Sequence, residues 1–509
     1  MADTDLQRLL VPTDPPVTVL RQAGIRAQEA TQQELSAQGL MALAGQSAAR
    51  LARAVAPHAR RIWIAAGPGH NGGDGLHAAC HLQRWGIPVQ VSLMGHPEQL
   101  PADAHAAWRL AVAEGVSIHA APDDEWLDQM TAQDLCLDAL LGIGGNRAPS
   151  EALQAWIARL NRSAAPVLAL DLPTGLNADS GQAWAGEPTA RNMVHAAYTL
   201  TFIAAKPGLF MGHGRDVCGD LWLDTLTRAC PQSGPCEPAA AWLNTPTNAP
   251  QKAHASHKGS HGDVAVIGGE ALQLHGMGMT GAAQLAAQAA LHGGAGRVIL
   301  SLLGQTIENS AVPPDVMQRA WDQLDLGHLT VVAGCGGGQA IAARMADLVA
   351  HSARLVLDAD GLNALAQDAR LQSLLRARAK ASGQLTTVIT PHPLEAARLL
   401  GCTTQEVQQD RLHAALALSD RLHCTVVLKG SGSVIASPGQ TPRINTSGNG
   451  LLAIGGTGDV LAGLIGARLA QEGDAHAAAC QAVWQHGAAA DHWPKDLALT
   501  ASRLAASLH

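Results

Sequence analysis

The 509-residue chain is longer than a single hydrophobic core usually supports, because domains typically hold about 100–250 residues. Hydrophobic residues make up 47% of the chain and charged residues 15%, which indicates a soluble globular protein. The formal net charge of −8 argues against a general electrostatic attraction to nucleic acid or to an anionic membrane.

The nine cysteines are dispersed and show no spacing typical of disulfides or zinc sites, so we expect reduced, buried thiols. No apolar run approaches the ~20 residues that a membrane-spanning helix needs. The N-terminal segment also lacks a basic region followed by an apolar one. We therefore expect a cytoplasmic protein that binds neither membrane nor nucleic acid.

Short apolar runs separated by helical stretches fill the first half of the chain. These runs span 61–67, 88–94, 134–142 and 166–175. Such alternation predicts a Rossmann-like parallel sheet with helices on both faces. Ligands of these sheets bind beyond the carboxyl ends of the strands, where the motifs of this half are found.

A glycine-rich segment, Gly67 to Gly75, follows the first apolar run and opens a helix. Glycines let the backbone approach a phosphate, and a helix N-terminus offers free N–H groups. A glycine-rich turn alone is weak evidence for a site. Here Asn71 and Asp74 stand between the glycines, which a purely geometric turn would not require.

Charged residues stand at the ends of strand-like segments of the first half. Asp138 and Asp171 each end a run, and each precedes a glycine-bearing loop. A lone aspartate there is more often a helix cap, but two at neighbouring strand ends favour a shared site. Lys206, in a Lys-Pro-Gly turn, is either a surface lysine or a cation directed at the same edge.

The alternating pattern is lost around residues 229–260, where proline, serine, asparagine and glycine are frequent, as in linkers. A second alternating series begins at 263–269. The sequence therefore predicts two tandem α/β domains, over 1–228 and 255–509, joined by a linker at 229–254.

The clearest local motif of the second half is Gly455-Gly456-Thr457-Gly458-Asp459, which opens an apolar helix. Glycine N–H groups and a helix N-terminus form a binding site for phosphoryl oxygens. Asp459 can orient or deprotonate a hydroxyl group there, although an acid in the first turn also suits the helix dipole. The spacing is not that of a P-loop.

Other strand ends of this half also carry glycine or polar residues. The segment 390–395 places His392 between two prolines and Glu395 in a first helical turn, where capping is the simpler interpretation. The segment 429–433 joins two apolar runs and can be a hairpin turn. Segments 334–338 and 358–360 close two more strands, so this edge holds more polar residues than capping needs.

Residues 15–225 resemble the NAD(P)H-hydrate epimerase domain through the motifs GHNGGDG, DALLGIG, DLPTG and TFIAAKPG, in family order. The resemblance implies a K⁺ ion held by Asn71, Asp138 and Thr174. Oxygen ligands suit such a hard cation. It also implies substrate contacts from His70, Asn71, Gly72, Gly73, Asp74, Gly142, Ile143, Gly144, Gly145, Asn146, Arg147, Ala148 and Asp171. We take Asp171 as the general acid/base, with Lys206 assisting by its charge.

The match to the epimerase pattern has departures. The family usually has asparagine at the position of His70, serine at Thr174, and often glutamate at Ala42. Threonine keeps the hydroxyl group, so the K⁺ site is little affected. His70 still forms hydrogen bonds, but its size can change the preference between NADHX and NADPHX, the hydrates of NADH and NADPH.

Residues 255–505 resemble the ribokinase-like ADP/ATP-dependent NAD(P)H-hydrate dehydratase domain through VVAGCGGG, TPHPLEAARLL, VVLKGSGSVI and GGTGDVLAG. The resemblance implies Mg²⁺ near the phosphates, adenine-nucleotide contacts and hydrate contacts. The nucleotide contacts are Lys429, Gly430, Ser431, Gly432, Ser433 and Gly458, and the hydrate contacts are Gly336, His392 and Asp459, the last as a catalytic residue. Family members often have GNPGMATGGTGD where this chain has GNGLLAIGGTGD.

The resemblances together predict metabolite repair: epimerisation of R- and S-NAD(P)HX, and dehydration of the S epimer to NAD(P)H with ADP or ATP. A small-molecule kinase is an alternative, but it has no use for a fused epimerase. A nucleotide-binding regulator is another, although it would not need the charged groups Asp138, Asp171 and Lys206. We also expect a homo-oligomer, since large α/β enzymes commonly associate symmetrically.

Overall fold

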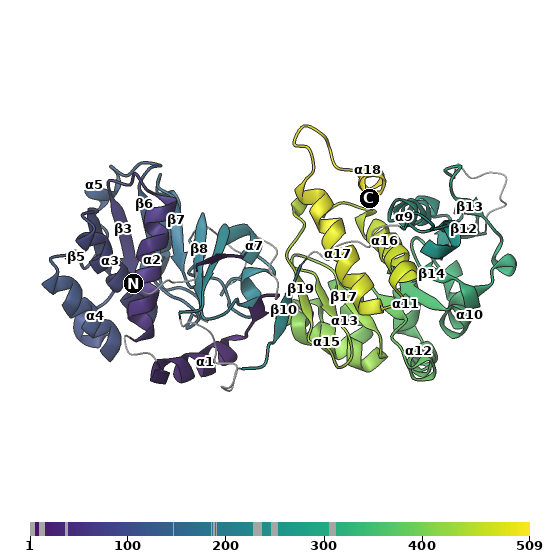
Figure 1. The fold of residues 1–509 in the computed structure, drawn as a ribbon, viewed down its shortest axis with the longest axis horizontal. Helices are drawn as coiled ribbons and strands as arrows, with labels where there is room; N and C mark the ends of the chain where they lie inside the picture. Colours follow the sequence, from purple (N-terminus) through teal and green to yellow (C-terminus); the bar gives the residue numbers. More distant parts are fainter. Residues whose placement is uncertain are drawn as a thin grey trace. The chain divides into compact units, whose positions relative to one another are not determined.

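A computed structural model describes residues 6–9, 16–35, 39–145, 147–184, 186, 189, 191–226, 237–245, 253–304 and 312–508. The chain divides into two compact units, Met1–Ala241 and Trp242–His509, each built on its own sheet (Figure 1).

The sheet of the first unit is parallel except at one edge. Its strands lie in the order β1-β9-β8-β7-β6-β3-β4-β5, and β1 alone pairs antiparallel, with β9. They span Gln7–Arg8 (β1), Ile62–Ala66 (β3), Val89–Leu93 (β4), Ser117–His119 (β5), Leu135–Ala139 (β6), Val167–Leu170 (β7), Tyr198–Phe202 (β8) and Asp220–Asp224 (β9). The four predicted apolar runs are β3, β4, β6 and β7, so the predicted parallel sheet is confirmed.

Helices cover both faces of this sheet. They are α1 (Gln22–Leu35), α2 (Leu40–Val55), α3 (His70–Arg84), α4 (Ala102–Ala113), α5 (Asp124–Leu127), α6 (Glu151–Arg162) and α7 (Gly214–Val217). Strand β3 shows the two faces directly. Ile62 and Ile64 pack with α2, α3 and α4, whereas Trp63 packs with α5 and α6. Burial on both faces explains why this strand is apolar throughout.

The strand order reverses between β3 and β6. The chain proceeds from β3 to β4 and β5 on one side, and from β6 to β7, β8 and β9 on the other. Loops that leave the carboxyl ends of β3 and β6 therefore diverge and leave a crevice, which is where doubly wound sheets bind ligands.

The second unit repeats this logic with a larger sheet. Its strands follow the order β13-β12-β11-β14-β15-β16-β17-β18-β19-β10, parallel except where β18 pairs with β17 and β19. They span Ala241–Asn244 (β10), Asp263–Glu270 (β11), Arg297–Leu303 (β12), Met317–Gln318 (β13), Thr330–Ala333 (β14), Arg354–Leu357 (β15), Thr387–Ile389 (β16), Thr425–Leu428 (β17), Val434–Ala436 (β18) and Arg443–Asn445 (β19). Here the order reverses between β11 and β14.

The main core of this unit lies under the C-terminal helices. Val264, Val332 and Val356 pack with α9, α16, α17 and α18, and Figure 1 shows α16 and α17 crossing the sheet.

The α-helices of the second unit are α8 (Leu272–His275), α9 (Thr280–His292), α10 (Met345–His351), α11 (Ala359–Gln367), α12 (Ala369–Ser382), α13 (Pro393–Leu400), α14 (Thr404–Gln409), α15 (Arg411–Leu422), α16 (Thr457–Glu472), α17 (Ala475–Asp491) and α18 (Ala501–Ser507).

The segment 229–254, which the sequence presents as a linker, contains a short strand. Strand β10 pairs in parallel with β19, with Leu243 opposite Ile444. Both of these side chains are buried.

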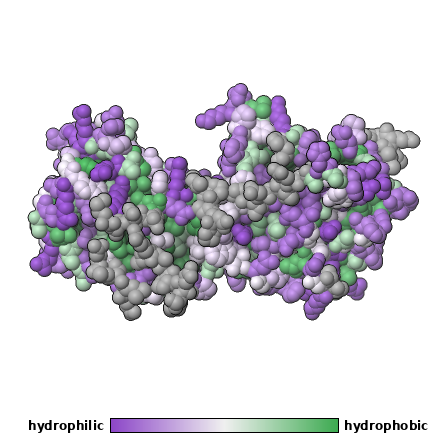
Figure 2. Space-filling model, in the orientation of Figure 1, coloured by the Kyte–Doolittle hydropathy of each residue, from purple (hydrophilic) through white to green (hydrophobic). Residues whose placement is uncertain are grey.

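The exposed surface carries few large apolar groups. Figure 2 shows mainly hydrophilic residues on the visible face, interrupted by small hydrophobic patches. Among the helices in the described part of the chain, none has the length and hydropathy to cross a bilayer.

Candidate functional sites

The glycine-rich segment after β3 forms the turn into α3, whose N-cap is Gly69. A Cβ atom at Gly67 would clash with the carbonyl oxygen of Leu140, and one at Gly72 with the carbonyl oxygen of Gly67. A Cβ atom at Gly69 would meet nothing within 4 Å. Several of these glycines are thus required by close packing, while Gly69 leaves the helix N-terminus open to a ligand.

A pocket of about 600 Å³ lies at this helix N-terminus, in the crevice that the strand order predicts. It is lined by seven of the predicted residues: His70, Asn71, Asp74, Gly142, Ile143, Gly144 and Asp171. Gly72 and Gly73 pack inside α3, and Gly145 packs against Trp184. Arg147 and Ala148 are not among the lining residues, and Asn146 lies outside the described residues.

Asp171 and Lys206 form the ionic centre of this pocket. The Lys206 ammonium donates hydrogen bonds to the Asp171 carboxylate, to Thr201 Oγ1 at 2.8 Å and to the carbonyl oxygen of Phe202 at 2.9 Å. The Lys206 side chain has 0% exposure, whereas that of Asp171 is 13% exposed and lines the pocket. The interpretation of Lys206 as a surface lysine is therefore wrong. Its amine contacts the site through Asp171.

The backbone at Asp171 is strained, because its φ of 67° lies in the left-handed region. Aspartate tolerates that region better than most residues, but the conformation still costs about 1 kcal/mol. Strain of this kind is frequent in active sites, and here it accompanies the carboxylate that faces the pocket.

Asp138 is fully buried and is not among the residues that line the pocket. Thr174 donates to it through the backbone N–H and through Oγ1, both at 2.8 Å. Burial raises the pKa of Asp138 to about 6, despite these hydrogen bonds. Asn71 is also buried, and neither its Nδ2 nor its Oδ1 has a hydrogen-bond partner among the described residues.

Two further carboxylates line the pocket wall. The predicted Asp74 is joined by Glu29 on α1, which no sequence motif indicated. Burial and the neighbouring Asp171 raise the pKa of both groups. Helix α1 is fastened beside the pocket because the Gln22 side chain donates to the carbonyl oxygen of Ile143.

In the second unit, Asp358, Lys429 and Asp459 gather at the carboxyl edge of the sheet. Lys429 Nζ lies 2.6 Å from Asp358 Oδ1, which also accepts a hydrogen bond from Thr390 Oγ1 at 2.8 Å. Burial by itself lowers the pKa of Lys429, but Asp358 and Glu395 offset that effect and the pKa is raised. Lys429 therefore stays charged next to the N-terminus of α16.

The motif 455–459 forms that N-terminus. Gly456 has a φ of 94°, which a residue with a side chain rarely adopts, and α16 begins at Thr457. A Cβ atom at Gly458 would lie 3.3 Å from Lys429 Nζ. The Lys429 ammonium therefore lies close to the backbone of Gly458 in the first turn of α16. Burial, followed by the charge of Asp358, raises the pKa of Asp459 to about 6.

The segment 429–433 forms the predicted hairpin between β17 and β18. The buried Arg411 donates to the carbonyl oxygens of Leu428 and Lys429, both at 3.1 Å, and so holds this turn. Gly430 has a φ of 138° and packs against the same guanidinium. Ser431, Gly432 and Ser433 lie in the hairpin itself.

His392 is the N-cap residue of α13. Glu395, for which capping was the simpler interpretation, is its partner in the cap. His392 Nδ1 accepts from the N–H groups of Leu394 and Glu395, at 3.1 and 3.3 Å. The Glu395 carboxylate accepts from the N–H of His392 at 2.8 Å, which completes a capping box. The other ring nitrogen, Nε2, therefore carries the proton in the neutral ring.

Comparison with known proteins assigns both units. Residues 37–208 match the family model described as YjeF-related protein N-terminus, and residues 264–508 match that described as NAD(P)H-hydrate dehydratase. The bifunctional NAD(P)H-hydrate repair enzyme of Escherichia coli is 36% identical over 89% of this chain and 84% of its own length. That of Coxiella burnetii is 34% identical over 91% of both chains.

Among solved structures, the ADP/ATP-dependent NAD(P)H-hydrate dehydratase from Bacillus subtilis, co-crystallised with ATP/Mg²⁺, is 28% identical. The match covers 51% of this chain and 92% of that one, with a TM-score of 0.43. The matches to the curated enzymes, which cover 89% and 91% of the chain, show that it belongs to the family of bifunctional NAD(P)H-hydrate repair enzymes.

Proposed function

We propose that this chain converts hydrated NADH and NADPH back to NADH and NADPH at two active sites. One is the pocket of the first unit, and the other lies at the carboxyl edge of the second sheet. The first unit interconverts the R and S epimers, and the second dehydrates the S epimer with ADP or ATP. The observation that carries this assignment is the pairing of an ionisable cluster with an open helix N-terminus at the carboxyl edge of each sheet.

Epimerisation requires a proton donor and acceptor at the hydroxyl-bearing carbon. Hydration of the dihydronicotinamide places that hydroxyl beside the ring nitrogen. The C–O bond breaks as the nitrogen lone pair forms a C=N bond, and water then adds to the opposite face. Asp171 gives a proton to the departing oxygen and takes one from the incoming water. Lys206 is a positioning residue, because its buried ammonium holds the Asp171 carboxylate.

Asn71, which lines the pocket, and the buried Asp138 and Thr174 have side chains that suit a K⁺ ion. Asn71 has a buried carbonyl oxygen without a partner among the described side chains and backbone, and buried polar atoms are seldom left so. Asp138 and Thr174 add oxygen atoms close to each other, and oxygen ligands suit hard cations. We propose that these three residues hold K⁺, which supplies positive charge near the anionic nucleotide.

Dehydration in the second unit begins with phosphoryl transfer. The terminal phosphoryl group of the nucleotide passes to the hydroxyl oxygen of the hydrate, and Asp459 accepts the hydroxyl proton. Phosphate then leaves with the C–O bond while the adjacent ring carbon loses a proton, which restores the double bond. The nucleotide enters as its Mg²⁺ complex, and Lys429 and the N–H groups around Gly458 bind its phosphates.

We assign the remaining nucleotide and hydrate contacts of the second unit from their positions at the carboxyl edge of the sheet. The hairpin 429–433 borders the nucleotide, while the ring of His392 and the backbone of Gly336 contact the hydrate. His392 Nε2 lies 3.2 Å from Glu395 Oε1, and this contact holds the ring in place. We also propose a symmetric homo-oligomer, which light scattering of the purified full-length chain tests.

The test uses two substitutions in the full-length chain with separated epimers of NADHX. We expect Asp171→Asn to lose conversion of the R epimer while the S epimer is still dehydrated. Conversely, we expect Asp459→Asn to interconvert the epimers without forming NADH. Normal R conversion in Asp171→Asn, or normal dehydration in Asp459→Asn, would exclude the corresponding residue as a proton-transfer group.

A further inference from the structure

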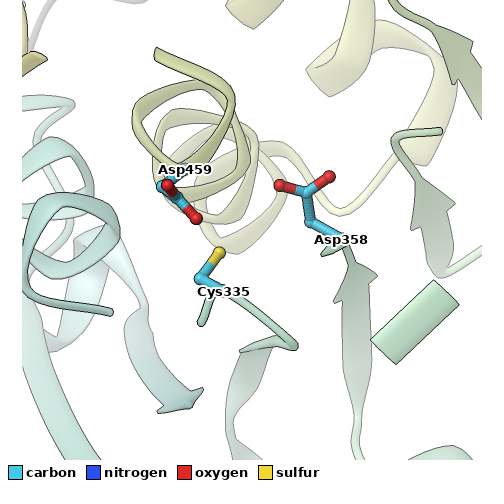
Figure 3. A group of neighbouring side chains, drawn as sticks. All are labelled: Cys335, Asp358 and Asp459. Carbon is cyan, nitrogen blue, oxygen red and sulfur yellow. The ribbon is translucent and has the colours of Figure 1, made fainter. Parts of the chain in front are cut away.

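A buried thiol lies beside the carboxylate proposed as the base of dehydration. Cys335 Sγ and oxygen atoms of Asp358 and Asp459 lie within 4.8 Å of one another. Figure 3 shows the Cys335 side chain, at the end of the β14 segment, pointing toward Asp459. Asp358 directly follows the neighbouring strand β15 and is the N-cap of α11.

The backbone around Cys335 fixes this direction. Gly334 and Gly336 have φ values of 107° and 57°, so both flanking residues adopt the left-handed region. Gly334 packs against the backbone of Asp358, and Gly336 packs against that of Met279. The thiol is therefore held between two fixed turns, with 0% exposure, and has little freedom to turn away.

The charges in this cluster favour a neutral thiol over a metal-bound thiolate. The Lys429 ammonium already lies 2.6 Å from Asp358 and would repel a cation there. Burial and the negative charges of Asp459 and Asp358 raise the pKa of Cys335 well above its usual range. The S–H proton is thus retained, and the Asp459 carboxylate, toward which the side chain points, can accept it.

We propose that Cys335 is a positioning residue whose S–H group donates a hydrogen bond to the Asp459 carboxylate. This inference rests on the proposed function of Asp459 as a proton acceptor. The bond occupies one carboxylate oxygen and leaves the other to face the hydrate hydroxyl. It also stabilises the charged form of Asp459, against the burial and the Asp358 charge that disfavour it.

The experiment compares pH profiles of dehydration for Cys335→Ala and Cys335→Ser, with S-NADHX and saturating ADP and Mg²⁺. Alanine removes the donor, so we expect the acid limb of kcat/KM to move up by about half a unit to one unit. Below about pH 6 that shift lowers kcat/KM by roughly threefold to tenfold, with little change above pH 8. Serine restores a donor, so its profile should return toward that of the wild type.

Cys424→Ala is the matched control, because Cys424 is an equally buried cysteine in the same unit. It loses the same volume but should leave the acid limb in place. An unmoved profile in Cys335→Ala, or a serine variant that behaves like alanine, would overturn the proposal. If Asp459→Asn keeps full dehydration, the proposed base itself is wrong. If Asp459→Asn is inactive but the pH profile of Cys335→Ala does not move, Asp459 remains the proposed base and only the role proposed for Cys335 is wrong.

Discussion

Replacing Lys206 by methionine would leave the Asp171 carboxylate without its buried counter-ion. The ammonium has 0% exposure and three hydrogen-bond acceptors, one of which is that carboxylate. Removing one partner of a buried ion pair costs about 3–5 kcal/mol, because the remaining charge is uncompensated. In a domain of this size about 1 kcal/mol corresponds to ~2–4 °C, so the melting transition of the first unit should fall by about 6–20 °C.

A double-mutant cycle separates the ion pair from simple loss of packing. Asp171→Asn keeps a side chain that tolerates the φ of 67°, so it tests the charge and not the backbone. We expect Lys206→Met with Asp171→Asn to be less destabilised than the sum of the single variants by about 2 kcal/mol or more. Calorimetry of the full-length chain measures this, with the second unit as internal reference. If the destabilisation of the double variant equals the sum of the two single variants within about 0.5 kcal/mol, the two side chains do not form a stabilising buried ion pair.

Three other perturbations follow from the structure. Gly72→Ala should destabilise the first unit by about 1–3 kcal/mol because its Cβ meets the carbonyl oxygen of Gly67, whereas Gly69→Ala should be nearly neutral in the same denaturant titration. Dehydration should fall as pH decreases through about 6, since protonation removes the basic form of Asp459; a rate that is flat to pH 5 would contradict this. Thr174→Val should weaken activation of epimerisation by K⁺, measured by titrating K⁺ into a choline buffer, while Thr174→Ser keeps it.

The fold was predictable because its signals are local. Apolar runs such as 61–67 and 134–142 are long enough to mark buried parallel strands, and each ends at a glycine or an aspartate. Strand β10 was not predicted, since four residues amid proline and serine carry too little pattern to outweigh a linker composition.

The site was predictable only in part. Asp171 and Asp459 stand in motifs, and the structure places each at a helix N-terminus or pocket. Three other features were less clear, because they depend on tertiary contacts. Lys206 stands in the motif TFIAAKPG, but the residues alone also allowed a surface lysine, and only the structure shows its side chain buried and bonded to Asp171. Glu29 reaches the pocket from a helix that precedes the epimerase motifs. Cys335 stands in VVAGCGGG, but nothing in that motif distinguishes its thiol from any small buried side chain until the fold places Asp459 nearby.

The most direct test of the two-activity account supplies the purified chain with the R epimer of NADHX alone, K⁺, Mg²⁺ and ADP. A parallel sample without enzyme measures spontaneous epimerisation. We expect complete recovery of dihydronicotinamide absorbance, because the first unit converts R to S and the second consumes S. Recovery no faster than the enzyme-free epimerisation rate, with the S epimer fully converted, would show that the first unit does not epimerise. No recovery from either epimer with ADP or ATP would show that the chain performs neither of the two proposed reactions.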